Sequence, residues 1–270
     1  MFTIWRTGHS INEEVSKALS IGTHFEIKHT ELLPMERNLK PAIAYGILRG
    51  TGLPGRNTGD TSVFKECDKH NKPWWELDRG YLRPNHFDGY YRISLNGMQA
   101  KYQRIDLPDD RVRKLDVKLY PVIKSGKYIL VCPPTEPVEQ FYGMESGKWL
   151  NDTINEIKKY TDRRIKIRDK HDSNAPLEHD LAEAHCVVTF NSSVALQAVI
   201  YGIPAIVSEH SVLHGWAANS ISCIEQDLLI NDRMELLKYI SYCQFTLDEF
   251  KNNKAFETAV MIQQYGVFDA

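Results

Sequence analysis

The stretch that most constrains the fold is TFNSSVALQAVIYGIP, which begins with the last two residues of a short hydrophobic run. That run, residues 186–190, is apolar and β-branched, as a buried strand should be. The polar turn at 191–193 offers good N-cap side chains, and apolar residues then recur at helical spacing over 193–201. Gly-Ile-Pro at 202–204 ends the helix, and Ala-Ile-Val at 205–207 is typical of the next strand. The segment predicts a strand–turn–helix–strand unit.

The turn of this unit is a candidate anion site. It directs backbone N–H groups and the positive end of a helix dipole toward the carboxyl edge of a parallel sheet, where a phosphate or carboxylate is favoured. Asn191, Ser192 and Ser193 would supply those groups. An ordinary βαβ unit with a well-capped helix explains the same local pattern, so both interpretations stay open here.

Strand and helix patterns alternate along both halves of the chain, which favours an α/β fold with open sheets. In the first half we expect strands at 2–5, 24–28, 42–48 and 74–77, and helices at 11–21 and 61–70. In the second half we expect strands at 128–132, 164–168, 186–190 and 205–207, helices at 147–160, 177–184 and 193–201, and a mostly helical tail at 234–264. We therefore predict two Rossmann-like lobes, residues 1–124 and 125–270, with strand ends facing a central cleft.

The composition is that of an ordinary globular protein. Of the 270 residues, 42% are hydrophobic and 25% are charged, and the formal net charge of −2 gives no global basic field for nucleic acid. The five cysteines are widely spaced without a CxxC pair, which favours reduced thiols over a disulfide frame or a zinc site. With no signal-peptide pattern and no apolar run long enough to span a membrane, we expect a cytoplasmic protein.

A pair of carboxylates stands at the end of the predicted strand 74–77, in WWELDRGYLRP. Glu76 and Asp78 are candidates for a general base, because partial desolvation beside aromatic residues raises the pKa of a carboxylate toward the working range. The competing interpretation is a surface ion pair with Arg79 or Arg83.

Basic residues leave the end of another predicted strand, in RIKIRDKHD. Arg168 and Lys170 would neutralise a phosphate there, and His171 would do so less strongly; a solvated helix and strand edge is the alternative for the whole basic run 158–170. A base at one strand end and phosphate donors at two others suit a transferase that acts on an activated phosphate ester. The glycine-rich loop at 49–60 has neither the GxGxxG nor the P-loop spacing.

Two segments together resemble the bacterial capsule-polysaccharide Kdo transferases. The order of strand, basic strand end and NSSVALQAVIYGIP is similar to that family's nucleotide-binding lobe, and WELDRGYLRP followed by DGYYRISLNG resembles its E-D-G-F-L-R segment. Tailed-phage proteins with D-x-G-Y followed by Y-Y-R-x-x-x-N are similar too. The resemblance covers residues 42–265 and implies a GT-B-like fold that transfers a sugar from a nucleotide-activated donor.

The resemblance also implies roles for single residues. Gln197 replaces a family Glu that would grip a sugar or ribose hydroxyl, and an amide can still bond such a hydroxyl. Arg79 replaces the acidic residue before the family's glycine, so Asp78 is the first choice for the base and Glu76 the second. The family's His-Pro is absent from RIKIRDKHD, so the resemblance does not fix Kdo as the donor sugar. The implied mechanism needs no divalent metal and no cofactor besides the donor.

The acceptor would be a glycan or, given the phage-like motif, a hydroxymethylated base in DNA. The residues expected on the acceptor side are Arg79, Arg83, Tyr91 and Arg92. They belong to a wider set of interleaved cations and tyrosines that also holds Tyr90, Lys101, Tyr102 and Arg104. Core packing is the alternative for the tyrosines. A phage-encoded enzyme would work in the host cytoplasm.

Two other functions stay open. Gln197 and Arg79 keep the hypothesis of a non-catalytic protein that binds a sugar nucleotide or a partner with a degenerate transferase fold. A sugar-nucleotide epimerase shares the two-lobe design and would form its product without an acceptor. The donor sugar, its nucleotide, the acceptor and the oligomeric state are not set by the sequence.

Overall fold

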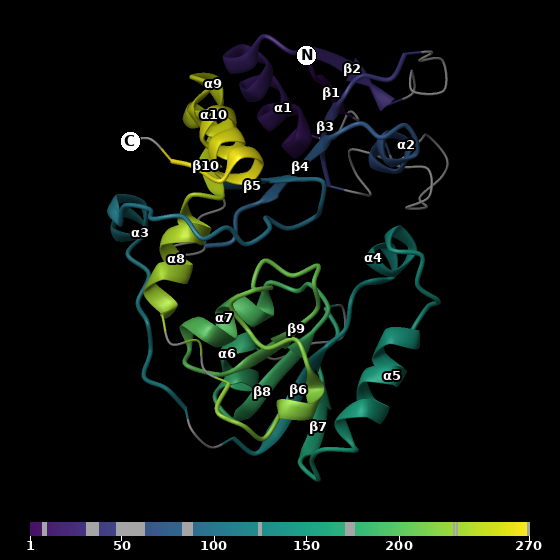
Figure 1. Ribbon diagram of the computed structural model, residues 1–270, viewed down its shortest axis with the longest axis vertical. Helices are drawn as coiled ribbons and strands as arrows, with labels where there is room; N and C mark the ends of the chain where they lie inside the picture. Colours follow the sequence, from purple (N-terminus) through teal and green to yellow (C-terminus); the bar gives the residue numbers. More distant parts are fainter. Residues whose placement is uncertain are drawn as a thin grey trace. The chain divides into compact units, whose positions relative to one another are not determined.

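The structure is a computed structural model that describes residues 1–6, 10–30, 38–46, 63–82, 89–123, 126–170, 176–228, 230 and 232–268. The chain divides into two compact units (Figure 1). The first comprises Met1–Asp116, Gln140–Tyr142 and Leu237–Ala270, and the second comprises Val117–Glu139 and Gly143–Leu236. Each unit holds one sheet with accompanying helices, so the predicted α/β class is confirmed.

The first unit is built on a six-stranded sheet in the order β10-β5-β4-β3-β1-β2. Strands β1 to β4 run parallel, β5 is antiparallel to β4, and β10 is antiparallel to β5. Every residue of β3, AIAY, is buried, which is typical of a parallel strand covered on both faces. The strands are β1 Thr3–Arg6, β2 Glu26–His29, β3 Ala42–Tyr45, β4 Trp74–Arg79, β5 Tyr90–Leu95 and β10 Gln244–Thr246.

One face of this sheet is covered by helices from both ends of the chain, namely α1 (Ser10–Thr23), α9 (Leu247–Lys251) and α10 (Lys254–Val260) (Figure 1). Val15 and Leu19 recur at helical spacing on α1 and are buried in one hydrophobic cluster with Trp75 of β4. Gly22 permits the close approach of α1 to α9, because a Cβ at this position would lie 2.2 Å from the carbonyl oxygen of Phe250.

Three shorter elements complete the first unit: α2 Val63–Lys69, α3 Asp110–Leu115 and a π-helical turn at Met261–Tyr265. Phe64 of α2 stacks on the indole of Trp74, with ring centroids 4.3 Å apart. Phe141 meets the same indole edge-on at 6.2 Å. Since Trp74 and Trp75 alternate along β4, these rings cover the face opposite α1.

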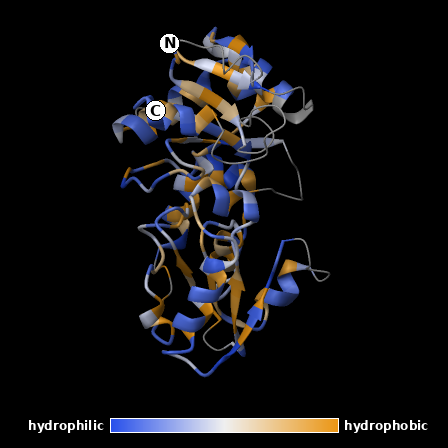
Figure 2. Ribbon diagram, turned by 90° about the vertical axis from the view of Figure 1, so that its right-hand side faces the viewer, coloured by the Kyte–Doolittle hydropathy of each residue, from blue (hydrophilic) through white to orange (hydrophobic). Residues whose placement is uncertain are grey.

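The second unit holds a four-stranded parallel sheet in the order β7-β6-β8-β9. Alternate residues of β6 enter two separate clusters, Leu130 in one and Ile129 in the other, so both faces of the sheet are covered. Figure 2 shows the hydrophobic residues concentrated on the strands. The elements are β6 Tyr128–Cys132, α5 Lys148–Ile157, β7 Arg164–Ile167, α6 Leu177–Leu181, β8 Ala184–Thr189, α7 Val194–Ile200, β9 Ala205–Val207 and a 3₁₀ turn at Ile221–Cys223. Two helices, α4 Glu136–Phe141 and α8 Arg233–Ser241, begin in the second unit and end in the first.

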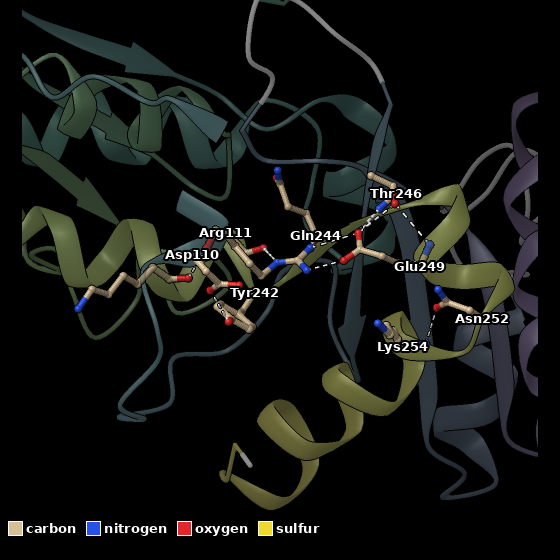
Figure 3. A network of polar contacts seen from close by, with 10 residues as sticks. Asp110, Arg111, Tyr242, Gln244, Thr246, Glu249, Asn252 and Lys254 are labelled. Atoms are coloured by element: carbon tan, nitrogen blue, oxygen red, sulfur yellow. Dashed lines mark hydrogen bonds and ion pairs between the residues drawn. The ribbon is translucent and has the colours of Figure 1, made fainter. Parts of the chain in front are cut away.

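The structure differs from the predicted division in the last part of the chain. The prediction assigned residues 125–270 to one lobe, whereas residues from Leu237 onward belong to the first unit. The physical reason is that β10 pairs with β5 and that Arg111 of α3 bonds this returning segment (Figure 3). The predicted helical tail 234–264 therefore contains a strand that completes the first sheet.

Candidate active site

The structure brings Arg92 of β5 to the two carboxylates of β4. Side chains alternate between the faces of a strand, so Glu76 and Asp78 lie on the same face. The antiparallel register places Asp78 opposite Arg92 and Glu76 opposite Ser94. These four residues form one polar group, which we call the carboxylate cluster.

Arg92 contacts both carboxylates of the cluster. Its Nη2 lies 2.8 Å from Oδ2 of Asp78 and 3.6 Å from Oε2 of Glu76. The side chain is only 12% exposed, and its guanidinium lies over the ring of Tyr81, 5.3 Å from the centroid. Arg92, which the sequence placed on the acceptor side, is therefore largely buried, and its charge is paired with the two carboxylates.

Glu76 is the buried member of the cluster, with an exposed fraction of 2%. Burial raises the pKa of its carboxyl well above the usual range, although the charge of Arg92 acts in the opposite direction. The hydroxyl of Ser94 lies 3.4 Å from Oε2 and donates at 2.8 Å to the carbonyl of Gly97. Glu76 therefore sits inside the unit, next to the guanidinium of Arg92.

Asp78 is the solvent-facing member, with a side chain 35% exposed. Its Oδ2 is held by Arg92, and its Oδ1 accepts the backbone N–H of Arg79 at 2.8 Å. The ion pair that the sequence suggested as the alternative to a base does exist for Asp78, but its described partner is Arg92. Arg83 lies outside the described residues.

Two other residues predicted for the acceptor side, Arg79 and Tyr91, lie on the opposite face of the sheet. The side chain of Arg79 bonds the hydroxyl of Tyr45. Tyr91 is 7% exposed and belongs to the hydrophobic cluster beneath α1, with its ring 6.4 Å from that of Tyr45. Tyr91 is thus a core residue, and its predicted acceptor-side role is wrong because the register of β5 turns it away from Arg92.

In the second unit, the Asn191–Ser193 turn follows the carboxyl end of β8. Thr189 fixes the turn, since its hydroxyl donates to the carbonyl of Cys132 at 2.7 Å and accepts the N–H of Ser192 at 3.3 Å. The hydroxyl of Ser192 accepts the N–H of Val194, also at 3.3 Å, at the first residue of α7. Ser193 is exposed and Asn191 half-buried, so the predicted turn is open to solvent.

Gln197, the fourth residue of α7, is half-buried. Its backbone N–H donates to the carbonyl of Ser193 at 3.2 Å. Within the described part of the chain its side chain has no hydrogen-bond partner, so the amide is available to a ligand hydroxyl.

The basic strand end of β7 already has a counter-charge. Asp180, 3% exposed, accepts from Lys166 at 2.5 Å and also pairs with Arg168. Burial alone would raise the pKa of Asp180, but the bonds from the two cations outweigh it and hold the pKa below its usual range. Lys170 is exposed, and His171 lies outside the described residues.

Sequence reasoning missed Asp180 and a second residue, His210. The imidazole of His210 packs on the ring of Phe190, with centroids 5.1 Å apart, directly before the Asn191 turn. His210 follows β9, so the strand-end argument used for the other sites would have found it. Asp180 has no such signal, because it lies on α6 and meets β7 only through the fold.

Among the residues that the structure describes, no three His, Cys, Asp or Glu side chains gather closely enough to hold a metal ion. In the same part of the chain, no helix combines the length and the hydropathy needed to cross a bilayer.

Comparison with known proteins finds similarity in structure but not in sequence. No protein-family model matches the chain, and no curated protein matches it. The KpsC β-Kdo 2,4-transferase of Thermosulfurimonas dismutans superposes with a TM-score of 0.51 at 10% identity, over 91% of this chain and 92% of that one. The KpsC β-Kdo 2,7-transferase of the same organism gives 0.53 at 11% identity, over 96% and 98%.

At this level of identity the likeness shows the fold. The chain has the two-sheet architecture of the KpsC transferases over nearly its whole described length. The resemblance to Kdo transferases that the sequence suggested is confirmed for the fold.

Proposed function

We propose that the protein is a glycosyltransferase that moves a sugar from a nucleotide-activated donor to a hydroxyl acceptor. The observation that carries the proposal is the near-complete structural match to two sugar transferases. A second observation supports it from the chain itself: Asp78 is a partly exposed carboxylate fixed by two hydrogen-bonding partners at the end of a strand.

In the proposed reaction Asp78 acts as the general base; Glu76, the second choice from the sequence, is buried away from a substrate. The carboxylate takes the proton of the acceptor hydroxyl while that oxygen bonds to the anomeric carbon of the donor. The bond between the anomeric carbon and the phosphate oxygen breaks, and the nucleotide leaves with the electron pair. Exclusion of water and alignment of the two substrates would supply much of the rate.

The leaving phosphate would be stabilised in the second unit by the turn residues Asn191, Ser192 and Ser193, with Gln197 bonding a sugar or ribose hydroxyl. Lys170 and His171 would add positive charge, and Arg168 would contribute to the extent that Asp180 leaves its charge available. Hydrogen-bond donors and cations in these places do the work of a divalent metal, so the proposed mechanism is metal-independent.

The second candidate function is a non-catalytic protein that binds a sugar nucleotide or a protein partner. It is favoured by the pairing of Arg168 with Asp180, which leaves less free charge for a phosphate. A third possibility, an epimerase, differs in needing no acceptor. For the transferase, a glycan acceptor fits the near-neutral net charge better than DNA, and modified DNA is retained as an arm of the test.

The test is to incubate the purified protein with CMP-, UDP- and GDP-linked sugars, including CMP-Kdo, and to identify the released nucleotide by mass spectrometry. The reactions are repeated with glycan acceptors and with hydroxymethylated DNA. Thermal stabilisation by the same panel shows separately whether a donor binds.

Asp78→Asn should lower kcat by about 100-fold or more while donor-induced stabilisation remains. Asp109→Asn is the matched control, because Asp109 is an exposed carboxylate of the same unit that pairs with Arg113, and it should turn over like the wild type. Binding without release of nucleotide would favour the second candidate, and neither binding nor release would reject both.

A further inference from the structure

We propose that Arg92 is a positioning residue that holds the carboxylate of Asp78 in its reactive orientation, with Glu76 anchoring Arg92 from inside the sheet. This inference rests on the proposed function, because it assigns Asp78 the part of the base. It assigns different roles to the two carboxylates: Asp78 faces the substrate, and Glu76 supports Arg92.

The geometry of Arg92 leaves its guanidinium little freedom. Nη2 lies between the two carboxylates, at 2.8 Å from Asp78 and 3.6 Å from Glu76, and Nη1 lies 3.4 Å from the carbonyl of Arg79. The ring of Tyr81 covers one side of the guanidinium. With both Nη atoms engaged and one side covered by the ring, the planar guanidinium is fixed in direction as well as in its distance from Asp78.

Asp78 is correspondingly fixed at both oxygens. Oδ2 meets Arg92, and Oδ1 accepts the N–H of Arg79. Each carboxylate oxygen can accept two hydrogen bonds, so both oxygens keep capacity for a substrate hydroxyl. The 35% exposure of the side chain provides the access that such a hydroxyl needs.

Glu76 cannot act as the base in place of Asp78, because its side chain is buried. Besides Arg92 and Ser94, the phenols of Tyr81 and Tyr142 and the carboxylate of Asp78 influence it electrostatically. Burial raises the pKa of Glu76, and the charge of Arg92 opposes this shift, so the carboxylate of Glu76 depends on Arg92 for its charge. A buried guanidinium without a counter-charge would be costly, so Arg92 and Glu76 depend on each other.

The test uses Arg92→Lys, which keeps the positive charge but loses the planar fork. Arg111→Lys is the matched control, because Arg111 is a second Arg of the same unit that pairs through both of its Nη atoms with a half-buried carboxylate, Glu249, without touching Asp78. We expect Arg92→Lys to lower kcat about 10- to 100-fold, since small misplacement of a reacting group costs rates of that order. The KM for the donor should change less than about 3-fold, and Arg111→Lys should keep kcat within about 2-fold at a temperature below its melting transition.

A second variant guards against loss of folding. Arg92→Met combined with Glu76→Gln removes both buried charges together, which is often tolerated when the replacements pack well. Crystal structures of the wild type and of this double variant then report the position of the Asp78 carboxylate directly. We expect its oxygens to move by more than about 0.5 Å or to occupy several rotamers.

Two results would overturn the proposal: an Asp78 carboxylate that stays in place in the double variant, or a kcat that falls equally in Arg92→Lys and Arg111→Lys. A wild-type protein that turns over none of the nucleotide sugars would reject the proposed function instead. In that case the crystal structures still decide whether Arg92 positions Asp78.

Discussion

Replacing Arg111 with Met should destabilise the first unit by about 3 kcal/mol. In the network of Figure 3, Nε of Arg111 donates to the carbonyl of Ser241 at 2.9 Å, Nη2 donates to that of Gln244 at 2.7 Å, and the guanidinium pairs with Glu249. Hydrogen bonds from a charged group contribute about 1.5–3 kcal/mol each, and removing one partner of a buried pair costs about 3–5 kcal/mol. The side chains of Arg111 and Glu249 are 19% and 23% exposed, so water recovers part of the loss and the lower end applies.

The matched control stands on the same helix. Arg113 pairs with Asp109, but its side chain is 76% exposed, so Arg113→Met should cost no more than about 0.5 kcal/mol. For a unit on the order of 150 residues, 3 kcal/mol corresponds to a melting temperature lower by about 6–12 °C. Differential scanning calorimetry measures the shift, and hydrogen exchange at β10 and β5 locates it. Equal shifts for the two variants would refute the reasoning.

The same network predicts how the effect depends on pH. Burial raises the pKa of Glu249, but the hydrogen bonds from Arg111 and Thr246 lower it by more than burial raises it. The pKa of Glu249 is therefore below its usual value. A carboxyl with a depressed folded-state pKa adds stability above its unfolded pKa of about 4.3, and this stability is lost as pH falls through the folded pKa. The difference between wild type and Arg111→Met should therefore shrink below pH ~4. A difference that stays constant down to pH ~2 would contradict the ion-pair account.

Two further predictions concern buried backbone groups. Gln244→Leu should destabilise the first unit by about 2–4 kcal/mol in urea unfolding. The amide oxygen of Gln244 accepts the N–H of Leu82 at 2.7 Å, and its amide nitrogen donates to the carbonyl of Leu82 at 2.9 Å. A loss under about 1 kcal/mol would mean that water replaces the Gln244 amide. Gly202→Ala should cost the second unit about 3 kcal/mol, since its Cβ would lie 2.2 Å from the carbonyl oxygen of Pro121 at a φ of +77°. Gly143→Ala, with a φ of +68° and open space, should cost about 1 kcal/mol, and equal melting of the two variants would disprove the clash.

Sequence patterns predicted the second sheet more closely than the first. The strands at 128–132 and 205–207 have the bounds that the pattern indicated, because each is a short, wholly apolar run that ends at polar or proline residues. Helix α5 begins one residue later than predicted and ends at Ile157 instead of residue 160, which is ordinary fraying of a helix end. Local periodicity suffices for such elements.

The returning strand β10 escaped prediction because its signal is not local. Its three residues, Gln-Phe-Thr, are too few to show a period, and they are held by β5 and Arg111, which lie more than a hundred residues earlier in the chain. The candidate site shows the same limit. Glu76 and Asp78 were identified from their place at a strand end, but only the antiparallel register shows that Arg92 joins them while Tyr91 turns into the core.

The pairing of β10 with β5 has a consequence for the order of folding during synthesis. Along the chain, the second unit lies between the first and last segments of the first unit. Every strand of the second sheet has therefore left the ribosome before residues 244–246 emerge. Until then β5 is the outermost strand of the growing sheet, with unpaired N–H and C=O groups that can recruit a strand from another nascent chain. A slow pause in translation before residues 244–246 have left the ribosome should therefore increase aggregation in the cell.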